Sequence, residues 1–315
     1  MREVTRLAPS PTGALHLGNA RTFLVNWALA RQGGWRVVLR VEDLDTPRVK
    51  AGVIELTVDL LGWLGMDWDE GPVVQSADLS PYRAAMERLA ERGLVYPCAM
   101  TRKEVEGAAS APQEGSHEVV FPASLRPPVI PRVFTDEAPS WRLAVGAGAV
   151  EFADDFAGPQ GFEVSRTIGD FIVWTHRDSG RPGQPAYQLA VVVDDARQGV
   201  TRVVRGDDLL ESASRQLLLY RALGLSPEPR YLHLPLVRGA DGRRLAKRHG
   251  DTRLDTYRAR GVRAERVVGL VAYWCEVVAA RQEMSSAEFR ERLDVHRIPR
   301  ARVTFTPEDE AWLLG

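Results

Sequence analysis

The first 41 residues constrain this chain most, because two kinds of regular structure alternate within them. Residues 4–8 predict a short strand, and the prolines and glycine of residues 9–13 break it, since proline lacks an N–H and glycine accepts left-handed angles. Apolar side chains then recur at helical spacing over residues 20–28, and residues 35–41 are rich in β-formers. A strand, a helix and a strand in succession form a βαβ unit, which predicts an α/β fold with a parallel sheet.

The turn and the helix start are suited to hold a phosphate. A glycine-containing turn that feeds a helix directs backbone N–H groups and the positive end of the helix dipole at one spot. His16 and Asn19 add side-chain donors there. Many strand–turn–helix units bind nothing, so the pattern alone leaves a purely structural turn open. The glycine fingerprint of dinucleotide sites is absent, so a nucleotide would sit on different turn chemistry.

The rest of the chain predicts further strands and a middle region of different composition. Residues 187–193 form a continuous apolar run that predicts a strand buried on both faces, and residues 200–204 and 233–237 predict two further strands. A loop is expected at residues 67–72, and residues 105–135 are rich in Gly, Ala, Ser and Pro. We therefore expect a discontinuous Rossmann-like domain (1–98 and 186–250), an inserted connective α+β module (99–185) and a helical C-terminal domain without a clear strand (251–315).

Composition and charge limit the cellular location and the kinds of binding partner to expect. No apolar run is long enough to cross a membrane and the N-terminus has no signal-peptide core, so we expect a cytoplasmic protein without a membrane partner. The two cysteines suggest no disulfide framework. Because the net charge is −1, a nucleic acid would have to be held by a local basic patch. Arginines and a lysine of residues 243–263 form one such patch, although a solvated helix face is the alternative.

Charged and polar side chains are expected to gather where several predicted strands end, namely His16, Glu42, Tyr187, Arg205 and Lys247. Anionic phosphates need cations, and an amino acid needs a carboxylate for its ammonium group and a guanidinium for its carboxylate. Each residue alone also has a structural explanation. Glu42 and Arg205 can form an ion pair, Tyr187 can be a core aromatic, and Lys247 can be a surface charge. Their gathering at strand ends favours a binding site.

These residues belong to a series of motifs that resembles class I glutamyl-tRNA synthetases over residues 1–250, in that family's order and spacing. The series begins with the family's form of the HIGH signature, from Pro9 to Asn19. It continues with residues 39–45, 67–72, 96–98, 169–170, 187–190, 204–207 and 233–236. The resemblance implies an α/β fold: a class I synthetase-type Rossmann-like parallel sheet with an inserted α+β module and a helical C-terminal part.

The resemblance also implies a role for particular positions. One set matches the family's glutamate-binding residues: Arg6, Leu7, Ala8, Pro9, Ser10, Glu42, Tyr187 and Arg205. Arg205 would bind a carboxylate and Glu42 the ammonium group. A second set matches the ATP-binding residues: Thr12, His16, Gly18, Asn19 and Lys247. The implied reaction is attack of the glutamate α-carboxylate on the α-phosphorus of ATP, with Mg²⁺ assisting, followed by transfer of glutamate to tRNA.

Two features depart from the family pattern. The loop that corresponds to the KMSKS motif consists of Arg244, Leu245, Ala246, Lys247 and Arg248. It keeps its positive charge but has lost a hydroxyl residue, and we expect activity to be retained through Lys247. Many short members carry a zinc site that begins with Cys-x-Cys after Tyr-Pro, and only Cys98 matches it here. Because tetrahedral zinc usually needs four ligands, we expect no zinc.

The length of 315 residues is similar to that of the family's short paralogues, which attach glutamate to the queuosine base at the first anticodon position of tRNA(Asp). The run of residues 186–199 is similar to them as well, and no anticodon-binding domain is expected. Two alternatives stay open. One is a truncated glutamyl-tRNA synthetase that charges the 3′ end of tRNA(Glu), and the other is a non-catalytic tRNA-binding module with the same fold. A monomer is the default expectation.

Overall fold

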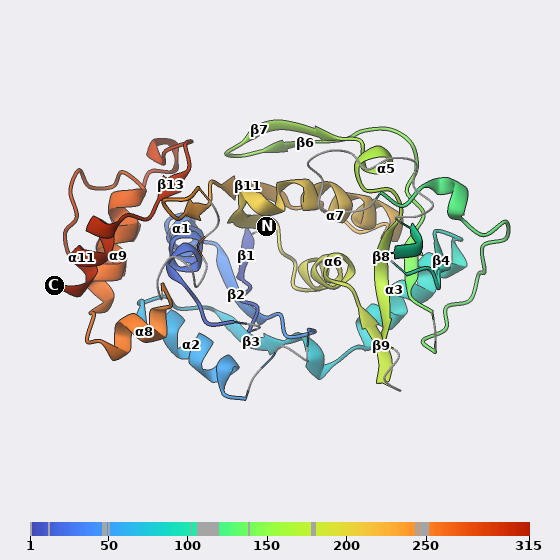
Figure 1. Ribbon diagram of the computed structural model, residues 1–315, viewed down its shortest axis with the longest axis horizontal. Coiled ribbons are helices and arrows are strands. Elements are labelled where there is room, and N and C mark those ends of the chain that lie inside the picture. Colours follow the sequence, from blue (N-terminus) through green and yellow to red (C-terminus); the bar gives the residue numbers. More distant parts are fainter. Residues whose placement is uncertain are drawn as a thin grey trace.

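A parallel sheet runs through the centre of the computed structural model (Figure 1). Its first three strands lie in the order β1 (Val4–Leu7), β2 (Arg36–Val41) and β3 (Glu70–Val74). On the other side of β1 lies β10 (Arg202–Gly206), because the Thr201 N–H donates to the Val4 carbonyl at 2.9 Å. The strand β11 (Arg230–Leu234) pairs with β10, also in parallel. The strand order therefore changes direction between β1 and β10, and the predicted parallel α/β sheet is confirmed.

The structure describes most of the chain, and the statements below concern these residues: 2–11, 13–45, 49, 51–101, 103–105, 120–137, 139–177, 181–242, 245 and 252–315.

Two hydrophobic cores lie on the two faces of this sheet, as the alternation of buried side chains along its strands requires. Leu7 and Leu39 point to one core and Val4 and Val38 to the other. The first core is covered by α1 (Leu17–Gln32), α2 (Val53–Trp63), α9 (Ala264–Trp274), α10 (Ser286–Arg292) and α11 (Pro307–Leu314). The second is covered by α3 (Ser80–Glu91), α6 (Tyr187–Arg197) and α7 (Leu210–Leu223). Gly224 ends α7 in the left-handed conformation at φ 64°, as expected of a glycine after a helix.

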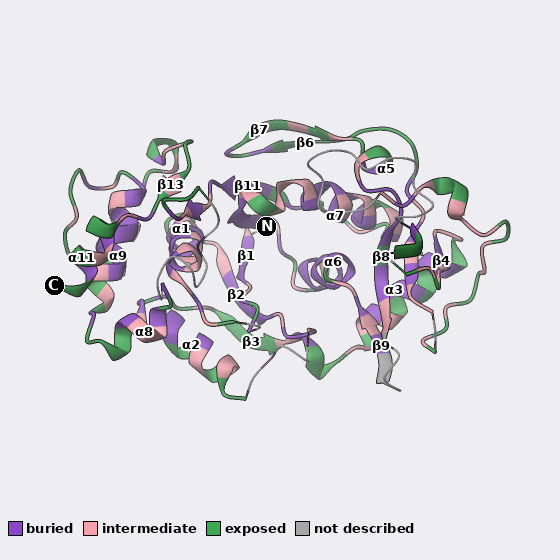
Figure 2. Ribbon diagram, in the orientation of Figure 1, coloured by how far each residue is buried: buried purple, intermediate pink, exposed green. Residues whose placement is uncertain are grey.

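One prediction about the core was wrong: residues 187–193 are not a strand but most of helix α6. Every residue from Gln188 to Asp195 is buried (Figure 2). A helix that is buried on all sides carries no 3.6-residue period, so its valine-rich sequence looks like that of a buried parallel strand. Tertiary packing overrides the β-propensity of these valines.

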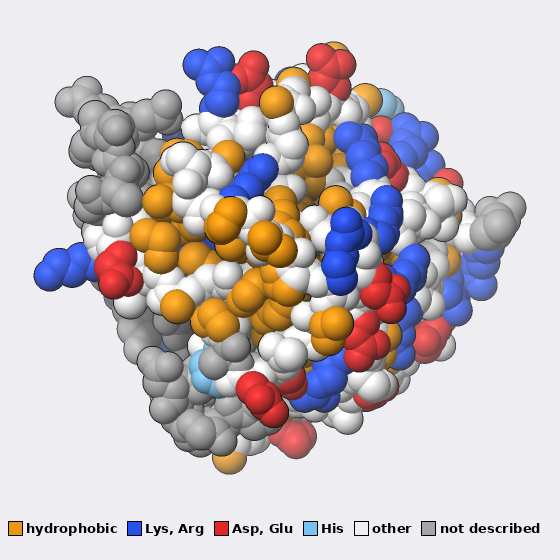
Figure 3. Space-filling view, turned by 90° about the vertical axis from the view of Figure 1, so that its right-hand side faces the viewer, with side chains coloured by type: hydrophobic (Ala, Val, Ile, Leu, Met, Phe, Trp, Pro, Cys, Tyr) orange, Lys and Arg blue, Asp and Glu red, His pale blue; other side chains and the backbone are white. Residues whose placement is uncertain are grey.

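Residues 95–185, which comprise the predicted insertion and the strand before it, contain two sheets. One is antiparallel, in the order β4 (Val95–Pro97), β5 (Trp141–Leu143), β8 (Phe171–Arg177) and β9 (Arg181–Pro185). The other is the hairpin β6 (Val150–Asp154) and β7 (Gly158–Phe162), which adds to the edge of β11. Part of the predicted insertion thus packs on the parallel sheet, and the domain boundaries stay a prediction. The end of the molecule formed by this part shows a central group of hydrophobic side chains (Figure 3); exposed apolar residues of the part include Val129, Val133 and Ile172.

The region after residue 251 is helical, as predicted, with one exception. Residues Val303–Thr304 form β13, which pairs with β12 (Val237–Arg238). A two-residue strand whose partner lies far away in sequence has no local signal. The loop expected at 67–72 likewise contains the start of β3. The remaining helices are short: α5 (Val164–Thr167), α8 (Leu254–Ala259), η2 (Gln75–Ala77), η3 (Ala123–Leu125), η4 (Asp207–Leu209) and η5 (Val295–Arg297). In the described ranges no helix is both long and apolar enough to traverse a bilayer.

Candidate active site

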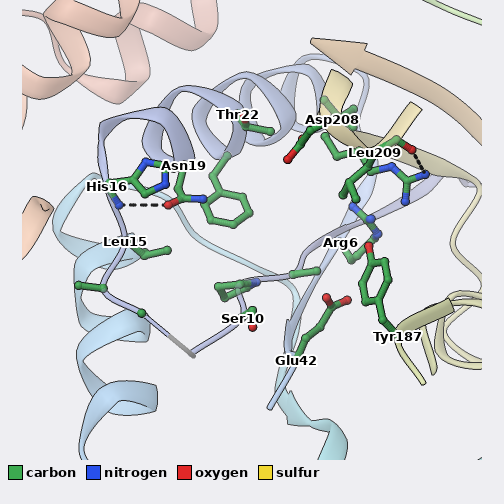
Figure 4. Close-up of a pocket in the computed structure, with 17 residues that line it drawn as sticks. Arg6, Ser10, Leu15, His16, Asn19, Thr22, Glu42, Tyr187, Asp208 and Leu209 are labelled. Atoms are coloured by element: carbon green, nitrogen blue, oxygen red, sulfur yellow. Dashed lines mark hydrogen bonds between the residues drawn. The ribbon is translucent and has the colours of Figure 1, made fainter. Parts of the chain in front are cut away.

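A cavity of about 420 Å³ lies at the carboxyl ends of β1, β2 and β10 (Figure 4). This is the point where the strand order changes direction, which is where open α/β sheets bind their ligands. Glu42, Ser10 and Tyr187 come from three different segments and face the same space. The complete lining is Arg6, Ala8, Pro9, Ser10, Gly13, Ala14, Leu15, His16, Asn19, Thr22, Phe23, Glu42, Tyr187, Val204, Arg205, Asp208 and Leu209.

Arg205 presents a nearly buried guanidinium to this cavity, with 5% of the residue exposed. Its Nε donates to His233 Nε2 at 2.9 Å, its Nη1 to Gln216 Oε1 at 2.9 Å, and its Nη2 to the Leu209 carbonyl at 3.2 Å. Within the described part of the chain, these bonds use three of the five N–H donors of an arginine. The two others, one on each terminal nitrogen, are left to bind an anionic group such as a carboxylate.

Glu42 lies on another wall and belongs to a buried ionic network. Its carboxylate lies 3.1 Å from Arg40 Nη2, and Arg40 Nη1 lies 2.7 Å from Asp195. Asp195 also lies 3.4 Å from Arg6 Nε. Burial raises the pKa of Glu42 above its ordinary 4.5, and the guanidiniums of Arg40 and Arg6 offset only part of this effect. The neighbouring guanidiniums therefore do not fully offset the cost of holding the ionised Glu42 carboxylate in this place, and a cation in the cavity would stabilise its ionised form.

Tyr187 stands at the first turn of α6 and is 40% exposed, so it is not a core aromatic. The Glu42 carboxylate is bonded to Arg40, whereas the structural alternative paired it with Arg205. Neither structural explanation that the sequence left open for these residues therefore accounts for them.

The start of α1 forms the third wall and is held by a reciprocal cap. Gly18 N–H donates to His16 Nδ1 at 3.2 Å, and His16 N–H donates to Asn19 Oδ1 at 3.1 Å. The neutral His16 ring therefore carries its proton on Nε2. A Cβ on Gly18 would lie 3.1 Å from His16 Cε1, so glycine at this position lets the imidazole pack over the helix start.

The cavity brings together most residues that the sequence predicted for it, but not all. Leu7 is completely buried in the hydrophobic core, so its side chain does not reach the cavity. Gly18 supports His16 and is not part of the lining. Leu245 is buried in the core, whereas the other four residues of its motif, Lys247 among them, and also Thr12 lie outside the described residues.

Sequence reasoning missed several members of the site. Asp208, Leu209, Thr22 and Phe23 line the cavity without having been predicted. Asp195, which pairs with Arg6 and Arg40, lies in α6 eight positions after Tyr187, about two helical turns further on. A helical interpretation of the 187–197 segment would have placed the two on one face.

A metal site would need several ligating side chains close together. In the ranges that the structure describes, no three His, Cys, Asp or Glu side chains come together as a metal site. Mg²⁺ usually binds through one or two carboxylates and the substrate's own phosphates, and two acidic residues, Glu42 and Asp208, line the cavity. Cys98 lines a separate small pocket with Met100 and His176. The absence of zinc stays a prediction.

Comparison with known proteins identifies the class to which this sheet and cavity belong. The family model of the class I tRNA synthetases (E and Q), catalytic domain, matches residues 3–309. The chain therefore belongs to this family and is an aminoacyl-tRNA synthetase-type ligase. The Glutamyl-Q tRNA(Asp) synthetase of Rhodopirellula baltica is 46% identical over 275 residues, or 84% of this chain and 82% of that protein. That of Symbiobacterium thermophilum is 45% identical and covers 98% of both chains.

Longer members of the family match as well. A glutamate–tRNA ligase of Geobacter sulfurreducens is 35% identical over 98% of this chain, which spans 64% of that protein. Among solved structures, a glutamate tRNA ligase from Elizabethkingia meningosepticum has a TM-score of 0.78, covering 99% of this chain and 69% of its own, at 24% identity. This structural likeness concerns the fold.

Proposed function

We propose that the protein activates L-glutamate with ATP to glutamyl-adenylate and transfers the glutamate to the queuosine base at the first anticodon position of tRNA(Asp). The choice of tRNA is supported by two relatives named Glutamyl-Q tRNA(Asp) synthetase, which are 45–46% identical over 84–98% of this chain. The observation that supports glutamate is the cavity with a nearly buried guanidinium, Arg205, and a mostly buried carboxylate, Glu42.

In this proposal the two charged side chains of the cavity bind oppositely charged groups of the amino acid. Arg205 binds a carboxylate through its two terminal nitrogens, and Glu42 accepts the ammonium group. The ammonium supplies the positive charge that Glu42 lacks, and Tyr187 and Ser10 complete the wall between them. A cavity of about 420 Å³ lies within the size range of small-ligand sites.

The chemistry then depends mainly on positioning and charge. The glutamate α-carboxylate attacks the α-phosphorus of ATP, and negative charge grows on the phosphate oxygens and the leaving pyrophosphate. The positive end of α1, the His16 Nε2–H and Lys247 would stabilise this charge, and Mg²⁺ bound to the triphosphate supplies further positive charge. A hydroxyl of the modified base then attacks the carbonyl carbon of the adenylate, the acyl–phosphate bond breaks, and AMP leaves as the ester forms. No covalent enzyme intermediate is required.

The test is glutamate-dependent ATP–pyrophosphate exchange without tRNA. It is followed by labelled glutamate offered with queuosine-containing tRNA(Asp), unmodified tRNA(Asp) and tRNA(Glu). We expect exchange, and label only on the queuosine-containing tRNA(Asp). Label on tRNA(Glu) would instead identify a 3′-end charging enzyme, and absence of exchange would contradict the proposal. Lys247→Ala is expected to lower exchange sharply, and near-normal exchange in that variant would remove Lys247 from the mechanism.

A further inference from the structure

A buried row of three side chains reaches the cavity from the edge of the sheet. Asp154 is the last residue of β6, His233 lies in β11, and Arg205 lies near the end of β10. The side chains of Asp154 and His233 have no exposed surface. His233 Nδ1 lies 2.6 Å from Asp154 Oδ2, and His233 Nε2 accepts from Arg205 Nε at 2.9 Å. The hairpin thus reaches Arg205 through the imidazole of His233.

The partners of His233 determine which ring nitrogen carries the proton. A guanidinium has donors and no acceptor, so Nε2 must offer its lone pair to Arg205. The proton of the neutral ring is therefore on Nδ1 and is donated to Asp154 Oδ2. Burial lowers the pKa of His233 below its ordinary 6.5, and the Arg205 charge acts in the same direction. The neutral ring is thus the form present at neutral pH.

Asp154 is itself held so that one oxygen always faces His233. Its Oδ1 accepts three backbone N–H groups, from Phe156 at 2.9 Å, Ala157 at 2.7 Å and His233 at 3.2 Å. Three donors around one atom require an acceptor at that atom. Oδ2 is therefore the atom left to receive the His233 proton.

We propose that Asp154 is a positioning residue for the ligand carboxylate: it fixes the proton of His233 on Nδ1, so that Nε2 orients the guanidinium of Arg205 in the cavity. The inference rests on the proposed function for the identity of that ligand as glutamate. The inserted hairpin thereby contributes to glutamate affinity without touching the substrate.

An isosteric substitution separates this role from simple packing. In Asp154→Asn the amide oxygen must take the Oδ1 position, because three backbone donors surround it. The amide NH₂ then faces His233 Nδ1, which has to become an acceptor. The ring proton moves to Nε2, where it opposes the Arg205 N–H. Because one buried donor is left without an acceptor, we expect glutamate binding to weaken about 10-fold or more, with ATP binding unchanged.

Two measurements on the full chain test this. Nitrogen-15 spectra of the histidine rings report the tautomer directly, with His233 assigned from a His233→Gln sample, and calorimetry with L-glutamate reports affinity. We expect Asp154→Asn to convert His233 to the Nε2–H form and to weaken glutamate binding. The matched control is Asp155→Asn, whose carboxylate pairs with Arg202 and Arg230 at the surface and should change neither readout.

A second variant at position 233 completes the test. Beside Asp154, the amide of glutamine can accept from Arg205 with its oxygen and donate to Oδ2 with its NH₂, so His233→Gln alone should keep most of the glutamate affinity. Beside asparagine at position 154 the same amide meets a donor on both sides, so Asp154→Asn combined with His233→Gln should stay weak. A role limited to packing predicts equal affinity for these two glutamine variants. An unchanged tautomer, or a changed tautomer with unchanged affinity, would overturn the inference. If the wild type binds no glutamate, the proposed function fails, and the tautomer of Asp154→Asn still decides whether Asp154 positions His233.

Discussion

Two poorly solvated carboxylates, Asp170 in the predicted insertion and Glu42 at the cavity, differ in how completely they are paired. Asp170 is 1% exposed and accepts from the Tyr96 hydroxyl at 2.5 Å, from Arg126 Nε and Nη2 at 2.6 Å each, and from the Val145 N–H at 2.8 Å. The carboxylate of Glu42 has one hydrogen-bonded partner among the described residues, Arg40, and burial raises its pKa. The first cluster is closed, whereas the second retains capacity for a ligand.

The extent of pairing indicates whether each carboxylate contributes to stability or to ligand binding. A closed cluster stabilises the fold, since removing its centre leaves buried donors without an acceptor. An open cluster costs the folded state some stability, because an ionised carboxylate is held in a poorly solvated place. Variants of the two regions should therefore separate loss of stability from loss of binding.

The largest effect is expected for Asp170→Ala. Tyr96 and Arg126 lose their acceptor, so the free energy of unfolding should fall by about 3–5 kcal/mol. Denaturant unfolding measures this, and glutamate affinity of the folded fraction should stay as it is. Glu163→Ala, which removes an exposed pair with Arg166, is the control and should change stability by less than about 1 kcal/mol. A loss for Asp170→Ala no larger than the control's would mean that the closed cluster does not stabilise the fold.

Arg205→Lys comes next. Lysine keeps the charge but cannot make the bidentate contact or the bond to His233, so the glutamate KM should rise about 10- to 100-fold while the ATP KM is retained. Pyrophosphate exchange at varied glutamate and ATP provides both constants. Equal increases in the two would indicate a general disturbance of the cavity rather than a carboxylate site.

Glu42→Gln should separate binding from stability, because it is expected to weaken glutamate binding without destabilising the fold. The glutamate KM should rise about 10-fold, the equivalent of ~1.4 kcal/mol, since the ammonium group loses its counter-charge. The free energy of unfolding should stay equal or increase, because a raised pKa means that the folded protein disfavours the ionised side chain. The control is Glu70→Gln, whose partner Arg36 lies at the surface. A marked loss of stability in Glu42→Gln would place Glu42 with the closed clusters.

The smallest effect is the pH dependence of glutamate binding. Only ionised Glu42 attracts the ammonium group, and its pKa is raised above 4.5, so affinity should begin to fall at a higher pH than for an ordinary glutamate. The weakening grows as pH decreases through that raised value. Calorimetry between pH 7.5 and 5 measures it, with ATP binding at each pH as the reference. Constant glutamate affinity over this range would show that the Glu42 charge is not used.

Most of the fold could be predicted because its signals are local. The opening strand, turn and helix, the second strand and the glycine that ends α7 all follow from the short-range preferences of proline, glycine and apolar spacing. Helix α6 could not be predicted, since burial on all sides removed its period. The ordering of β6 beside β11 depends on residues that are far apart in sequence.

The family, the signature loop and the charged side chains at the strand ends could all be identified from the amino-acid sequence, because they are properties of residue type and spacing. How these side chains are held became visible only in the folded structure. Asp154, His233 and Arg205 come from three strands, and Arg6, Arg40 and Asp195 from three further elements. Hydrogen bonds between such elements depend on the orientation of packed strands and helices, which no local pattern specifies.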